Sequence, residues 1–316
     1  MTVLILAPVT DDHAVAVAEQ IDALGGRAEI IDLAWFPEQA SLSMRLDSCA
    51  GCIASWVVHA GRRISLRDVD AVWVRRPQYP EVAEAMVRPS HRVFAANETH
   101  EALGGLWHAL RARWVNEPGA DDRAARKGYQ LVMAQERGLE IPRTLMTNDP
   151  DDALRFVDSC GYRDVIYKSF SSTADEWRET RLLKTEELAM LAHVAHAPVI
   201  FQEYVPAEYD LRVTVVAGQL FPAAIHSQQT AYPVDSRIDI GNARIEATAL
   251  PAEVAELLLG LTDDLCLVYG AIDLRLTPDG RYVFLEINPA GQFRYIEAAT
   301  GLPITAALAR ALLGPA

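Results

Sequence analysis

The order of strand-like and helical segments predicts an α/β domain followed by an α+β region with antiparallel sheets. Over the first 115 residues, short apolar runs alternate with helical spacing, which is typical of a parallel sheet. After residue 142, strand-like runs dominate and helices are interleaved with them. A chain of 316 residues is long enough for two or more domains with buried cores.

Three short apolar runs, at residues 3–6, 28–33 and 71–74, predict the strands of the first domain. Helical spacing at 14–24 ends at Gly25 and Gly26, and a second helix is predicted at 98–113. This is the layout of a βαβ unit. No G-x-G-x-x-G follows the first strand and no P-loop motif occurs, so neither of these two nucleotide-binding modes is supported.

The second region begins where Asn116, Pro118 and Gly119 mark a boundary. One helix is predicted at 120–137, closed by Gly138, and Pro142 starts the next segment. We expect strands at 165–168, 199–205, 211–216 and 221–227. A helix at 252–268 then precedes a hairpin at 270–288.

The hairpin carries the most informative polar residues. Its Pro-Asp-Gly turn predicts a register that places Asp273 opposite Phe284, with Glu286 as the diagonal neighbour of Asp273 at about 7 to 8 Å. Asp273, Glu286 and Asn288 then share one face with Arg275. Oxygen ligands without nearby Cys or His suit Mg²⁺ or Mn²⁺, so we predict a metal site here. A solvated polar face is the alternative.

Lysine is rare in this chain and occurs only at Lys127, Lys168 and Lys184, among 29 basic residues. Lys168 ends an apolar strand and Lys127 lies in a helical run, so a phosphate partner would explain both positions. For Lys127 an ordinary exposed helix position is the alternative, and Lys184 fits a surface position. The polar stretch between Lys168 and Lys184 is predicted to be a flap over bound phosphates, with a plain linker as the alternative.

The run at 199–205 ends in four residues that could contact a nucleotide, namely Gln202, Glu203, Tyr204 and Val205. Because Pro206 ends the strand ladder, we expect its last backbone donors and acceptors to be free for a base.

The next strand alternates polar and apolar residues. Asp210 and Arg212 fall on one face of it, and Arg212 is expected to point away from the core. An ion pair between these two residues is the alternative to a role in the site.

Composition narrows the possible partners and the cellular location. The net charge of -14 argues against a nucleic-acid partner. No apolar run is long enough for a membrane span, and four cysteines are too few for a disulfide scaffold, so we expect a cytoplasmic protein with no membrane partner. Cys49 and Cys52 form a lone C-x-x-C without a second pair, which favours an incidental role over metal binding.

With these pieces in place, the chain resembles the ATP-grasp superfamily. The resemblance rests on the order Lys127, Lys168, FQEYV, DLRVTVV, AIDLR and FLEINP, over roughly residues 116–316. More narrowly, VWVRRP at 72–77, NEPGADDRAARKGYQLVMAQERGLEIPRTL and FLEINPAGQFRYIEAATGLPI resemble the ATP-grasp ligases that mature graspetides, the microviridin-like ribosomal peptides.

The resemblance implies a fold and a reaction. The fold would be a Rossmann-like pre-ATP-grasp domain at 1–115, an ATP-grasp N-lobe with the flap at 116–195 and a C-lobe with the metal site at 196–316. The activity would be an ADP-forming ligase that phosphorylates an Asp or Glu side chain of a precursor peptide. A Ser, Thr or Lys side chain would then attack, which closes an ω-ester or ω-amide macrocycle. The partners would be a leader with an acidic core, and a second copy in a homodimer.

The resemblance also implies roles for particular residues. Lys127 and Lys168 would bind the phosphates of ATP. Residues Gln202, Glu203, Tyr204 and Val205 would frame the adenine, and Asp210 would lie toward the ribose. Asp273, Glu286 and Asn288 would hold Mg²⁺. The catalytic candidates are Lys168, Arg212 and Arg275, with Arg212 at the γ-phosphate or the acylphosphate.

Three further residues are candidates for the peptide-facing side, namely His226, Asp235 and Arg237. For His226, a histidine with satisfied partners at a strand end is the alternative.

Two other functions fit parts of the pattern. A RimK-like carboxylate–amine ligase shares the same ATP chemistry. A non-catalytic ATP-binding regulator on the same scaffold is the third possibility. The complete set of Asp273, Glu286 and Asn288 with Arg212 argues against the regulator, because a protein that only binds ATP does not need every transfer group.

Overall fold

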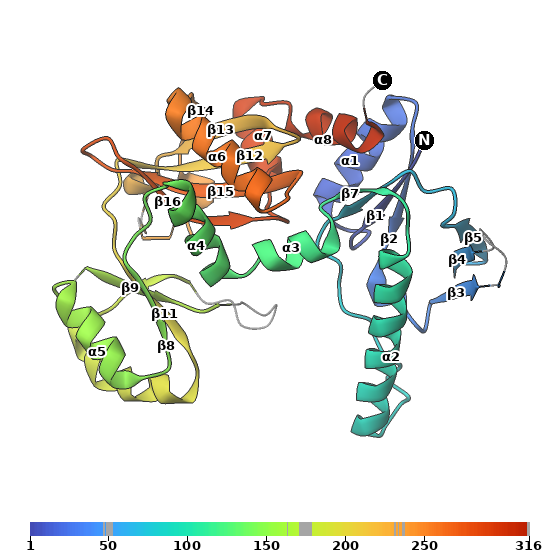
Figure 1. The fold of residues 1–316 in the computed structure, drawn as a ribbon, viewed down its shortest axis with the longest axis horizontal. Coiled ribbons are helices and arrows are strands. Elements are labelled where there is room, and N and C mark those ends of the chain that lie inside the picture. Colours follow the sequence, from blue (N-terminus) through green and yellow to red (C-terminus); the bar gives the residue numbers. More distant parts are fainter. Residues whose placement is uncertain are drawn as a thin grey trace.

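A computed structural model describes residues 1–46, 48, 53–162, 164–170, 179–230, 232, 234–235 and 238–314. Figure 1 shows an N-terminal domain at one side, a large sheet with its helices at the other, and a smaller lobe below that sheet. The α/β and α+β parts expected from the sequence are both present, which confirms the predicted fold class. None of the described helices is long and apolar enough to cross a lipid bilayer.

The N-terminal domain is built on a four-stranded sheet in the order β2-β1-β6-β7, in which all neighbouring strands are parallel. Its strands are β1 (Thr2–Leu6), β2 (Arg27–Ile31), β6 (Ala71–Val74) and β7 (Arg113–Val115). The helix α1 (Asp12–Ala23) connects β1 to β2 and is capped by Asp11, which accepts from Ala14 N. The chain order reverses between β1 and β6, which makes this the switch point of the sheet.

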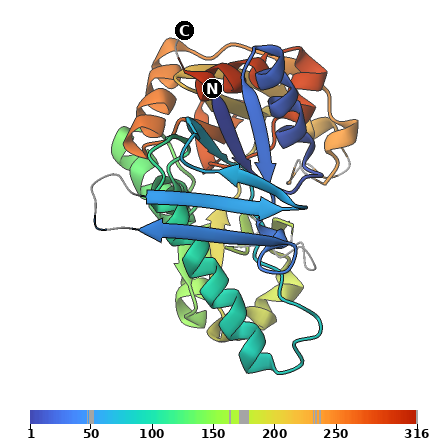
Figure 2. The same cartoon turned by 90° about the vertical axis from the view of Figure 1, so that its right-hand side faces the viewer.

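Part of this domain was not predicted. A three-stranded antiparallel sheet of β3 (Ala40–Leu46), β4 (Ile53–His59) and β5 (Arg62–Ser65) lies outside the parallel sheet (Figure 2). A short 3₁₀ turn, η1 (Leu33–Trp35), follows β2, so the predicted strand 28–33 ends two residues early. Cys49 and Cys52 lie outside the described residues.

The second helix of the domain is displaced from its predicted position. α2 covers Pro89–His108, so the predicted helix 98–113 begins too late and extends too far. Residues 113–115 instead form β7, which adds to the parallel sheet beside β6. Burial of Val115 in that sheet outweighs the helical propensity of the sequence before it.

The predicted helix 120–137 is two helices, α3 (Pro118–Ala124) and α4 (Lys127–Arg137). Arg126 between them has an extended backbone, with φ of -79° and ψ of 106°. The break exposes the carbonyl of Ala124, which accepts a hydrogen bond from Gln130 Nε2 at 2.5 Å. The break also makes Lys127 the first residue of α4.

The small lobe contains an antiparallel sheet in the order β10-β9-β11-β8. Its strands are β8 (Thr144–Thr147), β9 (Val165–Lys168), β10 (Arg181–Leu182) and β11 (Val199–Glu203), covered by α5 (Pro150–Ser159) and the 3₁₀ segment η2 (Thr185–His196). Because β11 pairs with β8 and β9, this sheet continues beyond the expected boundary at 196. We therefore propose that the lobe ends after Glu203.

The large sheet is also antiparallel and runs in the order β14-β13-β12-β15-β16. Its strands are β12 (Tyr209–Val216), β13 (Gln219–Ile225), β14 (Ile245–Ala247), β15 (Tyr269–Leu276) and β16 (Tyr282–Asn288). The helices are α6 (Ala252–Asp264), α7 (Arg294–Thr300) and α8 (Ile304–Leu313), with short 3₁₀ turns η3 (Ser227–Gln229) and η4 (Ile240–Asn242). The predicted helix 252–268 ends four residues early, because the chain turns at Cys266 with a φ of +56°.

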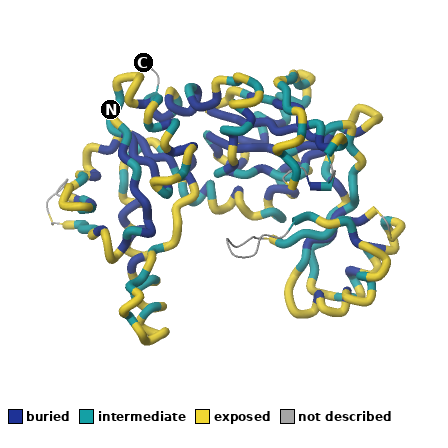
Figure 3. Tube along the Cα trace, turned by 180° about the vertical axis from the view of Figure 1, so that it is seen from behind, coloured by how far each residue is buried: buried dark blue, intermediate teal, exposed yellow. Residues whose placement is uncertain are grey.

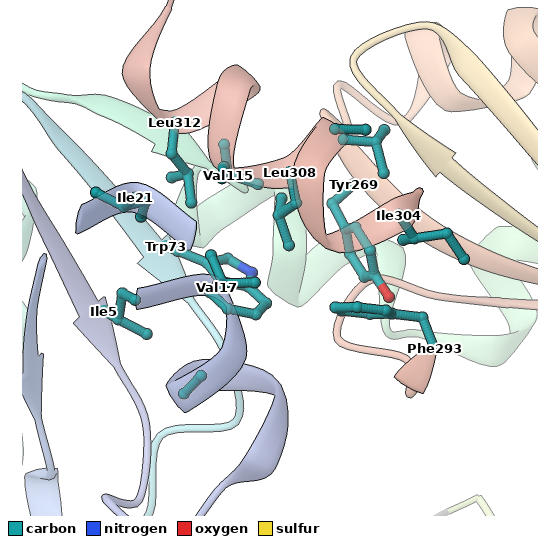
Figure 4. Close-up of a cluster of buried hydrophobic side chains, with 14 of the residues drawn as sticks. Ile5, Val17, Ile21, Trp73, Val115, Tyr269, Phe293, Ile304, Leu308 and Leu312 are labelled. Atoms are coloured by element: carbon teal, nitrogen blue, oxygen red, sulfur yellow. The ribbon is translucent and has the colours of Figure 1, made fainter. Parts of the chain in front are cut away.

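The N-terminal domain and the large sheet share one hydrophobic core. Figure 4 shows Ile5, Val17 and Trp73 on one side of it and Tyr269 and Phe293 on the other, with α8 packed between. The small lobe has a separate core around α5 and β11, and the buried segments in Figure 3 follow the sheets in each region. The apolar contact therefore joins the first domain to the large sheet and leaves the small lobe with its own core.

We expect His13 to make folding stability depend on pH. His13 is only 3% exposed, and its ring lies edge-on to Phe293 at 4.7 Å. Burial, followed by the charge of Arg75, lowers the pKa of His13 from 6.5 to about 4. The pKa of His13 is lower in the folded protein than in the unfolded chain. The free energy of unfolding therefore has its full value above pH 6.5, and the contribution of His13 to it is lost as pH falls through 4. The loss amounts to about 3 kcal/mol.

Urea unfolding between pH 7 and 4 measures this effect. His13→Gln removes the titrating group, so its stability should fall less with acid than that of the wild type. The exposed His91 on α2 provides the control, and His91→Gln should keep the wild-type pH profile. Identical profiles for His13→Gln and wild type would contradict the expectation.

Candidate active site

The β15–β16 hairpin places the three predicted metal ligands on one face of the large sheet. Asp273 pairs directly with Glu286, and Ala271 pairs with Asn288 two residues away. Directly opposed residues lie on the same face and closer together than diagonal neighbours. The predicted shared face is therefore correct, and the two carboxylates are closer in the ladder than the sequence suggested.

The predicted register itself is wrong. The turn closes with Thr277 N donating to Arg281 O at 2.9 Å, one residue further along than expected. The pairing then shifts again between Asp273 and the next residue, where Leu285 is the extra residue on β16. Phe284 consequently pairs with Leu274 and not with Asp273. A bulge of this kind leaves no signal in the turn sequence from which the register was counted.

Both carboxylates of the set are paired with cations. Lys127 Nζ donates to Glu286 Oε2 at 2.6 Å, and Arg212 Nη1 donates to the two carboxylate oxygens of Asp273 at 2.7 and 2.8 Å. Arg212 is 9% exposed. Burial opposes its charge, but the adjacent Asp273 carboxylate more than offsets this effect, so the pKa of Arg212 is raised. Arg212 thus stays charged beside the site. The alternative prediction paired Arg212 with Asp210, but Asp210 bonds to other residues.

The donor set suits a hard divalent cation. It consists of two carboxylates and one amide oxygen, all on one face. Asn288 is held in place because its Oδ1 accepts from Ala290 N at 2.9 Å. Across the described part of the chain, no cluster of three or more His, Cys, Asp and Glu residues could hold a metal. The asparagine therefore completes this set of ligands.

Lys168 reaches the site from the small lobe. It ends β9, opposite Ile200 of β11, and its Nζ donates to Gln202 Oε1 at 3.2 Å. Gln202 is 1% exposed and is itself fixed, since its Nε2 donates to Thr144 Oγ1 at 2.9 Å. The buried glutamine thus orients the lysine, a role that the sequence did not indicate.

The strand end at 203–205 is less free than expected. Glu203 N donates to Arg143 O at 2.9 Å and Tyr204 N donates to Asp164 O at 2.7 Å. The expectation of free donors at these two residues is therefore wrong, because flanking segments of the small lobe supply acceptors beyond the end of the strand. The Tyr204 ring lies against the guanidinium of Arg275 at 5.2 Å.

Arg275 and Asp210 form a buried network. Arg275 Nε donates to Asp210 Oδ1 at 2.9 Å, and its terminal nitrogens donate to the carbonyls of Val205 at 2.7 Å and Val234 at 3.1 Å. The other oxygen of Asp210 accepts from Ser227 Oγ at 2.6 Å. Since these donors hold neighbouring backbone in place, the geometry favours a positioning role for Arg275, and we propose that role in place of the expected catalytic one.

A cavity of about 270 Å³ lies where the two sheets face each other. Most of the predicted site residues line it, namely Lys127, Lys168, Gln202, Glu203, Val205, Asp210, Asp235, Asp273, Arg275, Glu286 and Asn288. Arg212, Tyr204 and His226 do not line it. The cavity therefore joins the predicted phosphate, base and metal residues in one space.

The peptide-side candidates have different positions. Asp235 lines the cavity and its Oδ2 accepts from Thr180 N at 3.1 Å. His226 follows β13, and its Nε2 lies 2.9 Å from Glu246 Oε1, so it has a partner away from the cavity. This agrees with the alternative prediction of a histidine with satisfied partners at a strand end. Arg237 and most of the predicted flap, residues 171–178, lie outside the described residues.

The sequence did not reveal the residues that hold the loop after β16. We call residues 289–292 the exit loop. Its carbonyls accept hydrogen bonds from Asn116 (3.2 Å to Pro289), Arg75 and Arg76 (Ala290), Tyr269 (2.7 Å to Gly291) and Arg212 (3.1 Å to Gln292). A signal was available for two of them, since Arg75 and Arg76 directly follow a strand at the carboxyl edge of a parallel sheet.

Two antiparallel sheets enclose a cavity, with Lys168 on one side and Lys127 beside the carboxylate pair on the other, and this arrangement defines an ATP-grasp ligase fold. The chain belongs to the ATP-grasp family. A model described as a RimK-like ATP-grasp domain matches residues 121–312, and one described as the MvdD pre-ATP grasp domain matches residues 2–122.

Solved structures agree over the whole chain. The macrocyclase MdnC from Microcystis aeruginosa MRC, bound with precursor peptide MdnA, is 31% identical, has a TM-score of 0.88 and covers 100% of both chains. A RiPP-associated ATP-grasp ligase from Chryseobacterium gregarium, in complex with ADP and a leader and core peptide, is 26% identical with a TM-score of 0.90, covering 99% of this chain and 97% of that one.

Curated relatives share the ligase part. A probable alpha-L-glutamate ligase from Shewanella halifaxensis is 27% identical over 261 residues, which is 80% of this chain and 52% of the relative. The chain therefore spans about half the length of this relative and of a second probable alpha-L-glutamate ligase from Shewanella pealeana.

Gly291 in the exit loop tests how tightly the site is packed. A Cβ at this position would lie 2.3 Å from Ala271 Cβ and 3.0 Å from Arg212 Nη2. Gly291→Ala should therefore destabilise the fold by about 1–3 kcal/mol and weaken binding of Mg·ADP. Gly104→Ala in α2, where a Cβ meets nothing within 4 Å, is the control and should be neutral or stabilising. Urea unfolding and calorimetric titration with Mg·ADP measure both effects, and unchanged stability in Gly291→Ala would contradict the packing argument.

Proposed function

We propose that this chain is an ADP-forming ligase that activates Asp or Glu side chains of a ribosomal precursor peptide and joins them to Ser, Thr or Lys side chains as macrocycles. The observation that carries the proposal is one cavity that brings the residues proposed for phosphate and metal binding together, in a chain that matches a peptide-bound macrocyclase over its full length. The match to the MvdD pre-ATP grasp domain supports a peptide-maturing ligase over a general one.

The roles of the residues follow from their positions. A carboxylate is a poor electrophile, and its phosphorylation turns one oxygen into a good leaving group. Lys127 and Lys168, one from each side of the cavity, neutralise the phosphates of ATP. Arg212, buried and charged, stabilises the negative charge of the transferred group. Gln202 keeps Lys168 aligned for this step.

Asp273, Glu286 and Asn288 would hold Mg²⁺, which would offset the negative charge of the phosphates. The base would lie at Glu203 and Val205, which line the cavity, and the ribose toward Asp210; Tyr204 does not line the cavity and lies against Arg275. Asp235 is the candidate on the peptide side that lines the cavity. We further propose a cytoplasmic homodimer, which the low cysteine count and the resemblance to graspetide ligases support.

A RimK-like ligase that adds amino acids to a protein or small acid is the second candidate. The curated glutamate ligases among the relatives favour it. Both reactions release ADP, so the acceptor distinguishes them.

Mass spectrometry of candidate peptides tests the proposed acceptor. Small reading frames next to the gene, with tails rich in Thr and Glu, supply the peptides. Incubation with the protein, ATP and Mg²⁺ should remove the mass of one water for each bond formed. Addition of free glutamate without any loss of water would instead support the RimK-like alternative, and no dehydration of any encoded peptide would refute the macrocyclase.

Glu286→Gln tests the metal assignment. Loss of one carboxylate should leave nucleotide binding measurable while it lowers the rate of ADP release by about 100-fold or more. The exposed Glu256 on α6 provides the control, and Glu256→Gln should retain the full rate. A coupled assay for ADP and calorimetric titration with ADP measure the two quantities. ADP release at the wild-type rate from Glu286→Gln would show that the metal assignment is wrong, and nucleotide binding without turnover in the wild type would favour a regulator.

A further inference from the structure

Two arginines of the N-terminal domain lie next to the proposed active site without a role in it. Arg75 and Arg76 directly follow β6, and Arg75 N donates to Leu6 O at the end of β1 at 3.0 Å. They therefore stand at the carboxyl edge of the parallel sheet, between β1 and β6. In open α/β sheets, ligands bind in the crevice at this edge, where the strand order reverses.

Arg75 points inward and is fully buried. It donates to the carbonyls of Ala290 and of Gly291, the latter at 3.3 Å, and its Nε lies 3.4 Å from Asp11 Oδ1. Its Nη2 has no hydrogen-bond partner among the residues that the structure describes. A buried guanidinium with an unmet donor indicates a place where an acceptor can bind.

Arg76 turns the other way and is exposed. Its backbone has a φ of +72°, a conformation that costs a residue other than glycine about 1 kcal/mol or more. Its Nε donates to Ala290 O at 3.1 Å, which fixes the side chain to the exit loop. In the described ranges, no carboxylate lies within 4 Å of Arg76 and its two terminal nitrogens have no hydrogen-bond partner.

The charges around the exit loop do not balance. Arg75, Arg76 and Arg212 all donate to its carbonyls, and the carboxylates nearest to them are Asp11 and Asp273. Although Arg76 is exposed at its surface, the protein atoms around its guanidinium displace part of the solvent, and this loss of solvation together with the positive charges of Arg75 and Arg212 lowers the pKa of Arg76. Asp273 would also be shared with Mg²⁺ in the proposed reaction, so the positive excess would grow when the site is loaded. An anion is the group that relieves this repulsion.

We propose that Arg76, supported by Arg75, forms an anion subsite that binds a side-chain carboxylate of the acidic peptide beside the exit loop. The guanidinium offers two parallel N–H groups, which match the two oxygens of a carboxylate. The acidic nature of the peptide rests on the proposed function. The subsite would give the N-terminal domain a direct part in substrate binding, since it holds one side of the exit loop and presents a cation next to it.

Binding of a fluorescent glutamate oligomer to the protein loaded with Mg·ADP, followed by anisotropy, tests the subsite. Arg76→Gln should weaken binding about tenfold, the loss of one charge-assisted contact. Arg76→Lys keeps the charge without the paired donors and should fall between the two. Arg67→Gln removes an exposed arginine of the same domain and should stay within about twofold of wild type. Calorimetric titration with ADP should be the same in all variants.

Three results would overturn the inference: no binding of the oligomer to the wild type, equal binding by Arg76→Gln, or an equal loss in Arg67→Gln.

With a precursor peptide that loses water, Arg76→Gln should raise the KM for the peptide and leave the KM for ATP unchanged. If no peptide loses water but oligomer binding still depends on Arg76, the subsite stands and the macrocyclase proposal fails. If dehydration proceeds in Arg76→Gln with the wild-type KM, the subsite fails and the macrocyclase proposal stands.

Discussion

Buried backbone carbonyls need donors, and this requirement governs the exit loop that follows the last strand of the large sheet, where Pro289 and Gly291 are buried. In the described part of the chain, no strand pairs with the loop to supply N–H groups, and the loop directly follows the proposed metal ligand Asn288. Its four carbonyls are each met by a side chain from elsewhere, namely Asn116, Arg75 with Arg76, Tyr269 and Arg212. These donors come from the N-terminal domain, the connection after β7 and the sheet itself. These donors thus hold the loop after the metal ligand, and Ala290 O keeps Arg75 as a donor when Arg76 is replaced.

The shared core explains how such a loop can be held from two domains. Trp73 and Val17 pack into the same cluster as Tyr269 and Phe293, so Arg75 after β6 and Tyr269 on β15 keep a fixed relation across it. The small lobe has its own core and carries Lys168 on β9. One side of the cavity is therefore built on the joint core of two regions, and the other side on a separate one.

Much of the site could be predicted from the sequence because it is carried by regular strands. Alternation along β15 and β16 was enough to place Asp273, Glu286 and Asn288 on one face, and the rarity of lysine singled out Lys127 and Lys168. The parts that were missed depend on long-range contacts. The bulge at Leu285, the break before Lys127 and the acceptors beyond β11 are set by neighbours distant in sequence, which local propensity does not record. The sheet of β3, β4 and β5 was missed, although ASLSMRL in β3 alternates apolar and polar residues, which is typical of a half-buried strand.

The net charge of -14 makes the arginines near the site important for binding an acidic peptide. An acidic peptide is repelled by the molecule as a whole, but that repulsion is screened beyond about 10 Å at moderate ionic strength. Contacts at short range between desolvated groups are screened much less. Arg75 and Arg212 are buried, and Arg76 is fixed next to them by the exit loop, so their positive charge acts at short range within the site. An acidic protein can therefore bind an acidic peptide when its cations are concentrated at the point where the two meet.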